Sequence, residues 1–466
     1  MERTYIKDLK EHVGSEVTIK GWIDVRRDQG KLIFLDFRDM TGKVQGVILP
    51  GADQAHEVGS QVRPEWVVEV KGKVNPRPER NVQADKMNGD IELEILSVAV
   101  LNTAETPPFN IDEDGKDIGE ETRLKYRYVD LRRDRMQKNI RMRHKAMQFV
   151  REFFTKEMFT EIETPYMTKS TPEGSRDYVV PSRIYQGKFY ALPQSPQQYK
   201  QLLMSAGFEK YFQIARCFRD EDTRGDRQPE FTQVDLEMSF VTQEDVMAVN
   251  EKMLIEMVQT LYPEKRIQQI PFPRISYAEA MEKYGNDKPD IREDKEDANL
   301  LAFCWVIDFP FFEKTDTGAW TFTHNPFSAP KPEFMEDLRA ESNIEGIVAA
   351  QYDIALNGYE IGGGGIRNHN PEDLKKVFKI MGYSDERIES NFGHMLTALA
   401  SGTPPHGGIA FGFDRLMMLL QNEPNIRETI AFAKTGEGRD PMMESPSEIA
   451  DTQLQELGII IKKPLK

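Results

Sequence analysis

The 466-residue sequence has little cysteine, no long apolar run and no excess of basic residues. Its two cysteines, Cys217 and Cys304, are too few for a disulfide framework and suit a reducing compartment. The apolar run 300–307 is much shorter than the roughly 20 residues that span a bilayer. The first residues are too charged for a signal peptide. These absences predict a cytoplasmic protein without a membrane partner.

The net charge of −16 argues against broad, nonspecific binding of nucleic acid. A local basic surface is still compatible with it, because residues 121–145 carry ten Lys and Arg against three Asp and Glu. Charge alone leaves two interpretations open for this segment. It is either a basic binding surface or an ordinary solvated helix face.

The first hundred residues have the pattern of short strands separated by turns. Alternating and β-branched residues mark candidates at 17–23, 32–37, 44–49, 67–74 and 91–96. Five strands of this length fit an OB-fold, whose open face commonly binds single-stranded nucleic acid, and the pattern excludes no other small barrel. The polar, proline-bearing stretch 103–109 predicts a linker. Helical spacing at 139–156 and 245–261 then predicts a mixed α+β domain of roughly three hundred residues.

Two distant segments place an arginine where phosphate chemistry could use it. They are FRDEDTRGDRQPEFTQVDLE (218–237) and GGIAFGFDRL (407–416), which contain Arg219 and Arg415. A guanidinium is a permanent, planar donor suited to phosphate, and the acidic residues Glu221, Asp353 and Glu360 could hold Mg²⁺ beside it. The alternative for each arginine alone is a pair with a surface carboxylate. The ordered set of motifs favours the phosphate interpretation.

Four consecutive glycines, 362–365, interrupt a strand-like segment. They indicate either close approach of a ligand to the backbone or a flexible loop. Lys200 and Arg367 are two cations that could bind an extra carboxylate of a substrate. Phe231 could stack on adenine or belong to the core. His324 has neither metal-ligand spacing nor a nucleophile partner, and no Ser/His/Asp or Cys/His arrangement is predicted.

These motifs resemble those of class II aminoacyl-tRNA synthetases, and over almost its whole length the chain is similar to bacterial-type aspartyl-tRNA synthetases. The resemblance implies an OB-fold anticodon-binding domain (1–105), a hinge (106–138) and a catalytic domain (139–466) with an antiparallel sheet flanked by helices. Pro165 matches a proline at the family's homodimer interface. The segments that carry the resemblance are 21–28, 126–133, 159–165, 168–177, 192–201, 218–237, 357–364 and 407–416.

The resemblance also implies a role for each matching residue. Arg219, Arg415 and Glu360 would be catalytic. L-aspartate would contact Glu173, Gln197, Lys200, Arg219, Asp235, His324 and Arg367. ATP would contact Arg219, Asp220, Glu221, Gln228, Phe231, Glu360, Gly412, Phe413, Asp414 and Arg415. Mg²⁺ would be held by Glu360 and Asp353, and the tRNA anticodon would be read by Arg27, Phe34 and Gln45.

The implied reaction has two steps. Aspartate attacks ATP to form aspartyl-adenylate, and the terminal ribose of the tRNA then takes the aspartyl group. The acceptor is tRNA(Asp), and Gln29 and Arg80, at positions that bias tRNA choice, incline the prediction slightly toward tRNA(Asn) as well.

The chain departs from the family pattern in three places. The large insertion of bacterial members is reduced to a short stretch near 286–299, Asn325 stands where a second histidine is usual, and Ala433 stands where a proline is common.

Three other functions share parts of this pattern. An asparaginyl-tRNA synthetase has the same motifs, but the two cations Lys200 and Arg367 suit a carboxylate better than an amide. An adenylate-forming amide ligase would not need an OB-fold. A non-catalytic RNA-binding paralogue would be expected to lose Arg219, Glu360 or Arg415, and all three are present.

Overall fold

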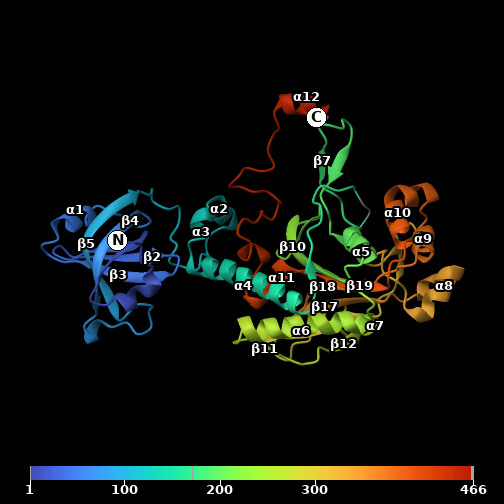
Figure 1. Ribbon diagram of the computed structural model, residues 1–466, viewed down its shortest axis with the longest axis horizontal. Coiled ribbons are helices and arrows are strands. Elements are labelled where there is room, and N and C mark those ends of the chain that lie inside the picture. The colour runs from blue at the N-terminus through green and yellow to red at the C-terminus, as the bar shows by residue number, and fades with distance from the viewer. Residues whose placement is uncertain (1, 171–172, 463–466) are drawn as a thin grey trace. The chain divides into compact units, whose positions relative to one another are not determined.

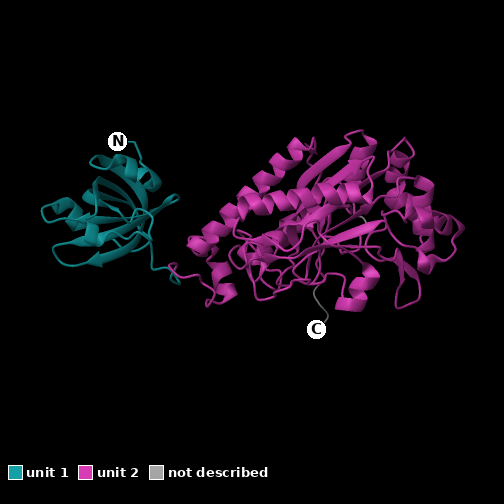
Figure 2. Cartoon of the chain, turned by 90° about the horizontal axis from the view of Figure 1, so that it is seen from below, with its two compact units in different colours: residues 1–110 teal, residues 111–466 magenta. Residues whose placement is uncertain are grey.

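The computed structural model describes residues 2–170 and 173–462. The chain divides into two compact units, Met1–Asn110 and Ile111–Lys466, each with a hydrophobic core of its own (Figure 2). The boundary at residue 110 directly follows the predicted linker 103–109. The finer division into 1–105, 106–138 and 139–466 stays a prediction.

The first unit is a closed five-stranded barrel with the strand order β1-β2-β3-β5-β4. Neighbouring strands are antiparallel except for the parallel pair β3–β5. A glycine is required at Gly46, because a Cβ there would lie 2.7 Å from the Phe37 ring and 2.8 Å from Ile95. The structure confirms all five predicted strands. They are β1 (Glu16–Asp28), β2 (Ile33–Asp39), β3 (Gly42–Ile48), β4 (Val67–Pro76) and β5 (Ile91–Asn102), with η1 (Ile6–His12), α1 (Asp53–Gly59) and η2 (Glu79–Asn81).

The second unit is built on an eight-stranded sheet with the order β12-β14-β17-β18-β19-β10-β9-β6 (Figure 1). Its central neighbours are antiparallel, and only the two edge pairs, β12–β14 and β9–β6, are parallel. This confirms the predicted α+β class with an antiparallel sheet. The strands are β6 (Thr160–Glu161), β9 (Lys210–Phe218), β10 (Glu230–Ser239), β12 (Arg274–Ser276), β14 (Phe303–Ile307), β17 (Gln351–Leu356), β18 (Tyr359–Ile366) and β19 (His406–Gly412).

The two faces of this sheet differ in chemistry because side chains alternate along a strand. On β10, Val234 and Leu236 point into the apolar core, where they pack with residues of β17, β19 and the helices. The intervening Asp235 and Glu237 point to the opposite face. The core face therefore stabilises the sheet, and the other face is left to carry polar groups.

Helices cover the apolar face. α4 (Asp134–Lys156), α6 (Gln243–Leu261) and α11 (Phe413–Leu420) contribute side chains such as Phe154, Leu254 and Leu416 to its core. The helices predicted at 139–156 and 245–261 are therefore confirmed. The backbone N–H groups of Thr242 and Asp245 each donate to the other residue's side chain, a capping box that starts α6.

Shorter elements complete the second unit. Its remaining helices are α2 (Glu120–Lys125), α3 (Arg127–Asp130), α5 (Gln197–Ser205), α7 (Tyr277–Tyr284), α8 (Met335–Ala340), α9 (Pro371–Ile380), α10 (Asp385–Leu399), α12 (Asp451–Leu457), η3 (Pro332–Phe334), η4 (Ile344–Gly346) and η5 (Ile426–Glu428). Two-stranded ribbons are formed by β7 (Val179–Pro181) with β8 (Phe189–Ala191), β11 (Arg266–Ile267) with β13 (Leu300–Leu301), and β15 (Phe312–Lys314) with β16 (Trp320–Phe322).

Three arginines of the basic segment 121–145 are buried. Arg123, Arg127 and Arg133 all contact the carboxylate of Asp130, at 3.2, 2.7 and 2.8 Å, and Arg123 also pairs with Glu428 at 2.5 Å. For these residues neither a binding surface nor a solvated helix face is correct. Arg123 and Arg127 bind α2 and α3 to the region of η5, and Arg133 donates to the Glu113 carbonyl. Over residues 2–170 and 173–462, no helix is long and apolar enough to cross a membrane.

Candidate active site

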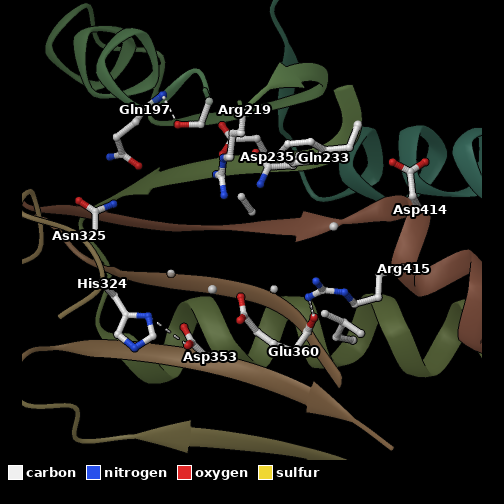
Figure 3. A pocket seen from close by; sticks show the side chains of 18 of the residues that line it. Gln197, Arg219, Gln233, Asp235, His324, Asn325, Asp353, Glu360, Asp414 and Arg415 are labelled. Atoms are coloured by element: carbon white, nitrogen blue, oxygen red, sulfur yellow. Dashed lines mark hydrogen bonds and ion pairs between the residues drawn. The ribbon is translucent and has the colours of Figure 1, made fainter. Parts of the chain in front are cut away.

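A cavity of about 320 Å³ lies over the polar face of the large sheet (Figure 3). Strands β10, β17, β18 and β19, the N-terminus of α5, and the residues that follow β9 all contribute side chains to it. Most of the predicted site residues are brought together here. Those lining the cavity are Gln197, Lys200, Arg219, Glu221, Gln228, Phe231, Asp235, His324, Asp353, Glu360, Arg367, Gly412, Asp414 and Arg415.

Four buried charges form a cluster at one end of the cavity, which we call the inner cluster: Lys200, Asp235, Glu237 and Arg367. Lys200 Nζ lies 2.6 Å from Asp235 and 3.2 Å from Glu237. Arg367 binds Glu237 through Nε at 2.9 Å and Nη2 at 3.3 Å. Each of the four residues is at most 2% exposed. Two cations and two carboxylates therefore balance one another out of contact with solvent.

The two carboxylates of the inner cluster titrate differently. Burial is the largest influence on Glu237 and acts to raise its pKa, but Arg367 and Lys200 together lower it. Burial likewise raises the pKa of Asp235, and there the opposing effect of Lys200 is too small to reverse it. Because Asp235 Oδ2 is buried and accepts no hydrogen bond, it can take a further cation, such as the ammonium group of an amino acid.

A second acidic group lines the cavity at β17 and β18. Asp353 is buried, and burial followed by the charges of Glu360 and Asp287 raises its pKa well above the usual value. His324 Nδ1 lies 3.7 Å from Asp353 Oδ2 (Figure 3), and burial lowers the pKa of this imidazole. A cation beside Asp353 would favour its charged form and oppose the effect of the neighbouring carboxylates. Glu360 and Asp353 therefore fit the few carboxylate ligands that Mg²⁺ takes when phosphates supply the rest.

The described residues contain no group of three or more His, Cys, Asp or Glu side chains placed to hold a metal ion by themselves. Any Mg²⁺ at Glu360 and Asp353 would thus depend on oxygen atoms from a bound substrate. This agrees with the preference of Mg²⁺ for water and phosphate over all-protein cages.

Two arginines reach into the cavity from different elements (Figure 3), and we call them the arginine pair: Arg219 and Arg415. Arg219 follows β9, donates from Nε to the Gln194 carbonyl at 3.3 Å and lies 5.2 Å from the Phe231 ring centre. Within the described part of the chain it forms no ion pair. Arg415, on α11, binds Asp226 at 3.0 Å and donates to the Glu360 carbonyl, while its Nε is buried without a partner.

The glycines 362–365 are part of strand β18 and form no loop. A Cβ on Gly364 would lie 2.2 Å from the Gly408 carbonyl oxygen of the neighbouring strand. A Cβ on Gly363 would lie 2.6 Å from Asp353 Oδ1, within the acidic group. The flexible-loop interpretation is therefore wrong. The glycines let the neighbouring strands lie close together, and the predicted approach of a ligand to this backbone stays a prediction.

Three of the predicted aspartate and ATP contacts lie outside the lining of this cavity. Glu173 lines an adjoining cavity of about 440 Å³ and accepts from Ser195 Oγ at 3.1 Å, and Ser195 lines both cavities. Asp220 faces Arg176 at 3.6 Å. Phe413, the first residue of α11, is fully buried in the apolar core. Two residues of the predicted substrate loop 168–177, residues 171 and 172, lie outside the described residues.

Other predicted residues are held by the surrounding chain. Glu221 accepts from Ser175 Oγ and pairs with Arg227 at 3.0 Å. Gln228 Oε1 accepts from the Lys434 backbone at 2.8 Å. Asp414 binds the Thr232 backbone N–H at 2.8 Å and Arg143 at 2.6 Å, and so anchors β10 to α4 and α11.

Several residues of the site were not predicted. The most important is Glu237, which binds both Lys200 and Arg367; its spacing of two from Asp235 on a predicted strand would have placed it on the same face. Unlike Glu237, six further polar residues that were not assigned a role line the cavity itself: Ser195, Asp226, Arg227, Gln233, Asn325 and Gln351.

The predicted anticodon residues lie on strands of the barrel. Arg27 on β1 is the cross-strand partner of Phe34 on β2 and donates to Gln45 Oε1 on β3 at 3.3 Å. Gln29 follows β1, and Arg80 lies in η2. An aromatic side chain beside polar ones, all at least partly exposed, can bind unstacked bases.

Comparison with known proteins establishes the family. The family model "tRNA synthetases class II (D, K and N)" matches residues 119–436, and "OB-fold nucleic acid binding domain" matches residues 17–101. An aspartate–tRNA ligase of Staphylococcus saprophyticus is 39% identical, with 96% of this chain and 97% of that protein aligned. The chain belongs to the aspartate–tRNA ligase family.

Another member of this family, an aspartate–tRNA(Asp/Asn) ligase of Rubrobacter xylanophilus, is 39% identical over 97% of this chain and 96% of its own length. The fold is also that of asparaginyl-tRNA synthetase from Pyrococcus horikoshii, with a TM-score of 0.75, 23% identity, and coverage of 93% of this chain and 98% of that one. The Staphylococcus alignment spans 573 positions, 107 more than the chain has residues, so this chain lacks a substantial part of that relative.

Proposed function

We propose that this chain is an aspartate–tRNA ligase that activates L-aspartate with ATP and transfers it to the 3′ end of tRNA(Asp). The inner cluster is the observation that carries the choice of amino acid. Lys200 and Arg367 offer two buried cations to a side-chain carboxylate, and Asp235 Oδ2 offers an unused acceptor to the ammonium group. Both oxygens of a side-chain carboxylate can accept from these two cations, whereas an asparagine amide offers one oxygen and an NH₂ group that cannot accept.

The remaining residues suit adenylate formation. Arg219 and Phe231 both line the cavity, where Arg219 would bridge the substrate carboxylate and the α-phosphate and Phe231 would stack on adenine. Arg415 would bind the γ-phosphate. Because a preorganised guanidinium need not reorient as charge develops, such donors stabilise a transition state strongly. Mg²⁺ at Glu360 and Asp353 would neutralise part of the phosphate charge, and no covalent enzyme intermediate is needed.

The partners follow from the same family membership. The barrel would read the anticodon through Arg27, Phe34 and Gln45, while Gln29 and Arg80 incline the proposal toward charging of tRNA(Asn) as well. The two cysteines are free and buried, which suits a protein working in the cytoplasm.

A homodimer is part of the proposal. The edge strand β6 lies beside three exposed apolar side chains, Met158, Phe208 and Phe240, which are 77%, 46% and 69% exposed. Their loops are neighbours, since Lys210 Nζ donates to the Glu157 carbonyl and Ser239 N to the Glu209 carbonyl. An exposed apolar group of this kind marks an interaction surface. Light scattering after size exclusion would give twice the chain mass for a dimer.

Amino-acid-dependent exchange of pyrophosphate into ATP tests the proposed chemistry. Aspartate is expected to support exchange, and asparagine to give no more than background. Preference for asparagine would make the chain an asparaginyl-tRNA synthetase. Exchange with neither amino acid would favour a non-catalytic RNA-binding protein.

A further inference from the structure

A series of buried hydrogen bonds connects the start of β19 to the inner end of the cavity. His406 Nδ1 lies 2.8 Å from the Pro404 carbonyl oxygen, and His406 Nε2 lies 3.2 Å from Gln201 Nε2. Gln201 Oε1 in turn accepts from Gln197 Nε2 at 2.9 Å. His406 and Gln201 are fully buried, and Gln197, which lines the cavity, is 5% exposed.

The hydrogen-bonding roles along this series are set by its first member. A carbonyl oxygen can only accept, so His406 Nδ1 carries the hydrogen, and Nε2 of a neutral imidazole is then an acceptor. Gln201 must direct its NH₂ group toward His406 and its oxygen toward Gln197. Gln197 directs its NH₂ group toward Gln201, so its oxygen points away from Gln201 and is the acceptor left for a ligand.

We propose that His406 and Gln201 are positioning residues that hold the Gln197 amide with its oxygen toward the ammonium group of the amino-acid substrate. The proposal rests on the aspartate-activating function proposed above. Gln197 Oε1 and Asp235 Oδ2 would be two acceptors for one ammonium group. A reversed amide would instead present its NH₂ group, which repels a cationic donor.

The surroundings of His406 favour the neutral ring that this arrangement needs. Burial lowers the pKa of His406; Glu237 and the Pro404 carbonyl oppose that effect, and Arg367 and His369 add to it. A protonated ring has no acceptor atom, so its Nε2–H would require the opposite orientation of Gln201 and hence of Gln197. Affinity for aspartate should therefore fall in acid.

The decisive experiment compares aspartate with succinate, which has both carboxylates of aspartate and no ammonium group. In His406→Leu, KM for aspartate in pyrophosphate exchange should rise about five- to tenfold, as expected for one lost hydrogen bond. The inhibition constant of succinate and KM for ATP should stay within about twofold of wild type, because neither ligand uses the Gln197 oxygen.

Three further variants separate positioning from general damage. Gln201→Met keeps the side-chain length, removes both hydrogen bonds and should reproduce the selective loss, even if His406→Leu fails to fold. His406→Gln should restore much of the aspartate affinity, because its side-chain oxygen can reach the place of the imidazole Nε2. His394→Leu is the matched control: His394 Nε2 lies 2.7 Å from Gln198 Oε1 on the same helix α5, but Gln198 lines the adjoining cavity.

The possible outcomes are distinct. A rise in the aspartate KM without a change for succinate supports the positioning role. Equal weakening of both ligands, or of neither, in His406→Leu and Gln201→Met overturns it. If wild type shows no aspartate-dependent exchange, the proposed function fails first, and the positioning role fails with it.

Discussion

The inner cluster and the arginine pair differ in how completely their charged groups are paired. In the inner cluster each cation already has a carboxylate, and all four residues are buried. In the arginine pair, Arg219 has a carbonyl partner, and Arg415 pairs with Asp226 but keeps a buried Nε without a partner. The inner cluster is thus a fully paired network. A small zwitterion would bind there by contacting charged groups that already have an ion-pair partner. The arginine pair keeps donor capacity for a strongly anionic group.

The largest predicted effect comes from breaking the inner cluster. Arg367→Met leaves Glu237 buried with only Lys200, and removing one partner of a buried ion pair typically costs about 3–5 kcal/mol of unfolding free energy. Urea unfolding followed by Trp fluorescence, a signal that does not depend on activity, measures this loss. Aspartate-dependent exchange should disappear as well.

Arg339→Met is the control for that variant. Arg339 makes the same bidentate contact with a carboxylate, at 2.9 and 2.8 Å from Asp373, but its side chain is 55% exposed. Solvent screens an exposed pair, so no measurable loss of stability is expected. Equal losses in the two variants would contradict the contrast between buried and exposed pairs.

The next largest effect concerns the arginine pair. Arg219→Ala should lower the rate of aspartate-dependent pyrophosphate exchange by at least about 10²-fold, as for the loss of one preorganised transition-state donor. Stability should change little, because Arg219 has no ion pair within the described residues. Arg216→Ala, three residues earlier on β9 and outside the cavity lining, is the control. Near-normal exchange in Arg219→Ala would remove the role assigned to it.

A smaller effect is expected at Lys265, a buried lysine without a carboxylate partner. It tests whether such a lysine lowers the free energy of unfolding while it is charged. Unlike Lys200, its Nζ binds two neutral oxygens, Ala298 O at 2.9 Å and Asn422 Oδ1 at 2.5 Å. Burial lowers the pKa of Lys265 to about 8. Between that value and about 10.5 the unfolded chain holds more protons than the folded one, so the contribution of Lys265 to stability rises with pH.

The measurement is the unfolding free energy of wild type minus that of Lys265→Met. This difference should increase by about 1–2 kcal/mol in favour of wild type from pH 8 to pH 10. A difference that is constant or decreases over this range would show that the pKa of Lys265 is not lowered in the folded chain.

The smallest predicted effect is on tRNA choice and comes from a residue of the barrel. It should not involve the inner cluster or the arginine pair. Gln29→Leu is expected to lower charging of tRNA(Asn) relative to tRNA(Asp) by about fivefold, the free energy of roughly one hydrogen bond. Pyrophosphate exchange without tRNA should not change. A variant that altered exchange would instead indicate a role for Gln29 outside tRNA choice.

Local pattern was sufficient to predict much of the fold. The barrel strands alternate in the sequence, and the periodicity of 139–156 and 245–261 matches α4 and α6. For the site, the arginine motifs could be placed because a strand precedes Arg219 and a strand followed by a helix surrounds Arg415. Glu237 was missed although the two-residue period of β10 placed it beside Asp235.

Long-range contacts could not be predicted in this way. The contact of Gln201 with His406 joins residues 205 positions apart, and no local pattern of either segment signals it. The burial of Arg123, Arg127 and Arg133 likewise depends on Asp130 and the distant Glu428, so composition alone suggested an exposed segment. Glycines 362–365 were ambiguous because their role depends on the strands on both sides.

Aspartylation of purified tRNA(Asp) and tRNA(Asn), assayed separately with ATP and Mg²⁺, tests the central claim most directly. Aspartylation of tRNA(Asp) is the predicted result, and comparable charging of tRNA(Asn) would add the relaxed choice that Gln29 and Arg80 suggest. Charging of neither tRNA by folded protein would contradict the account.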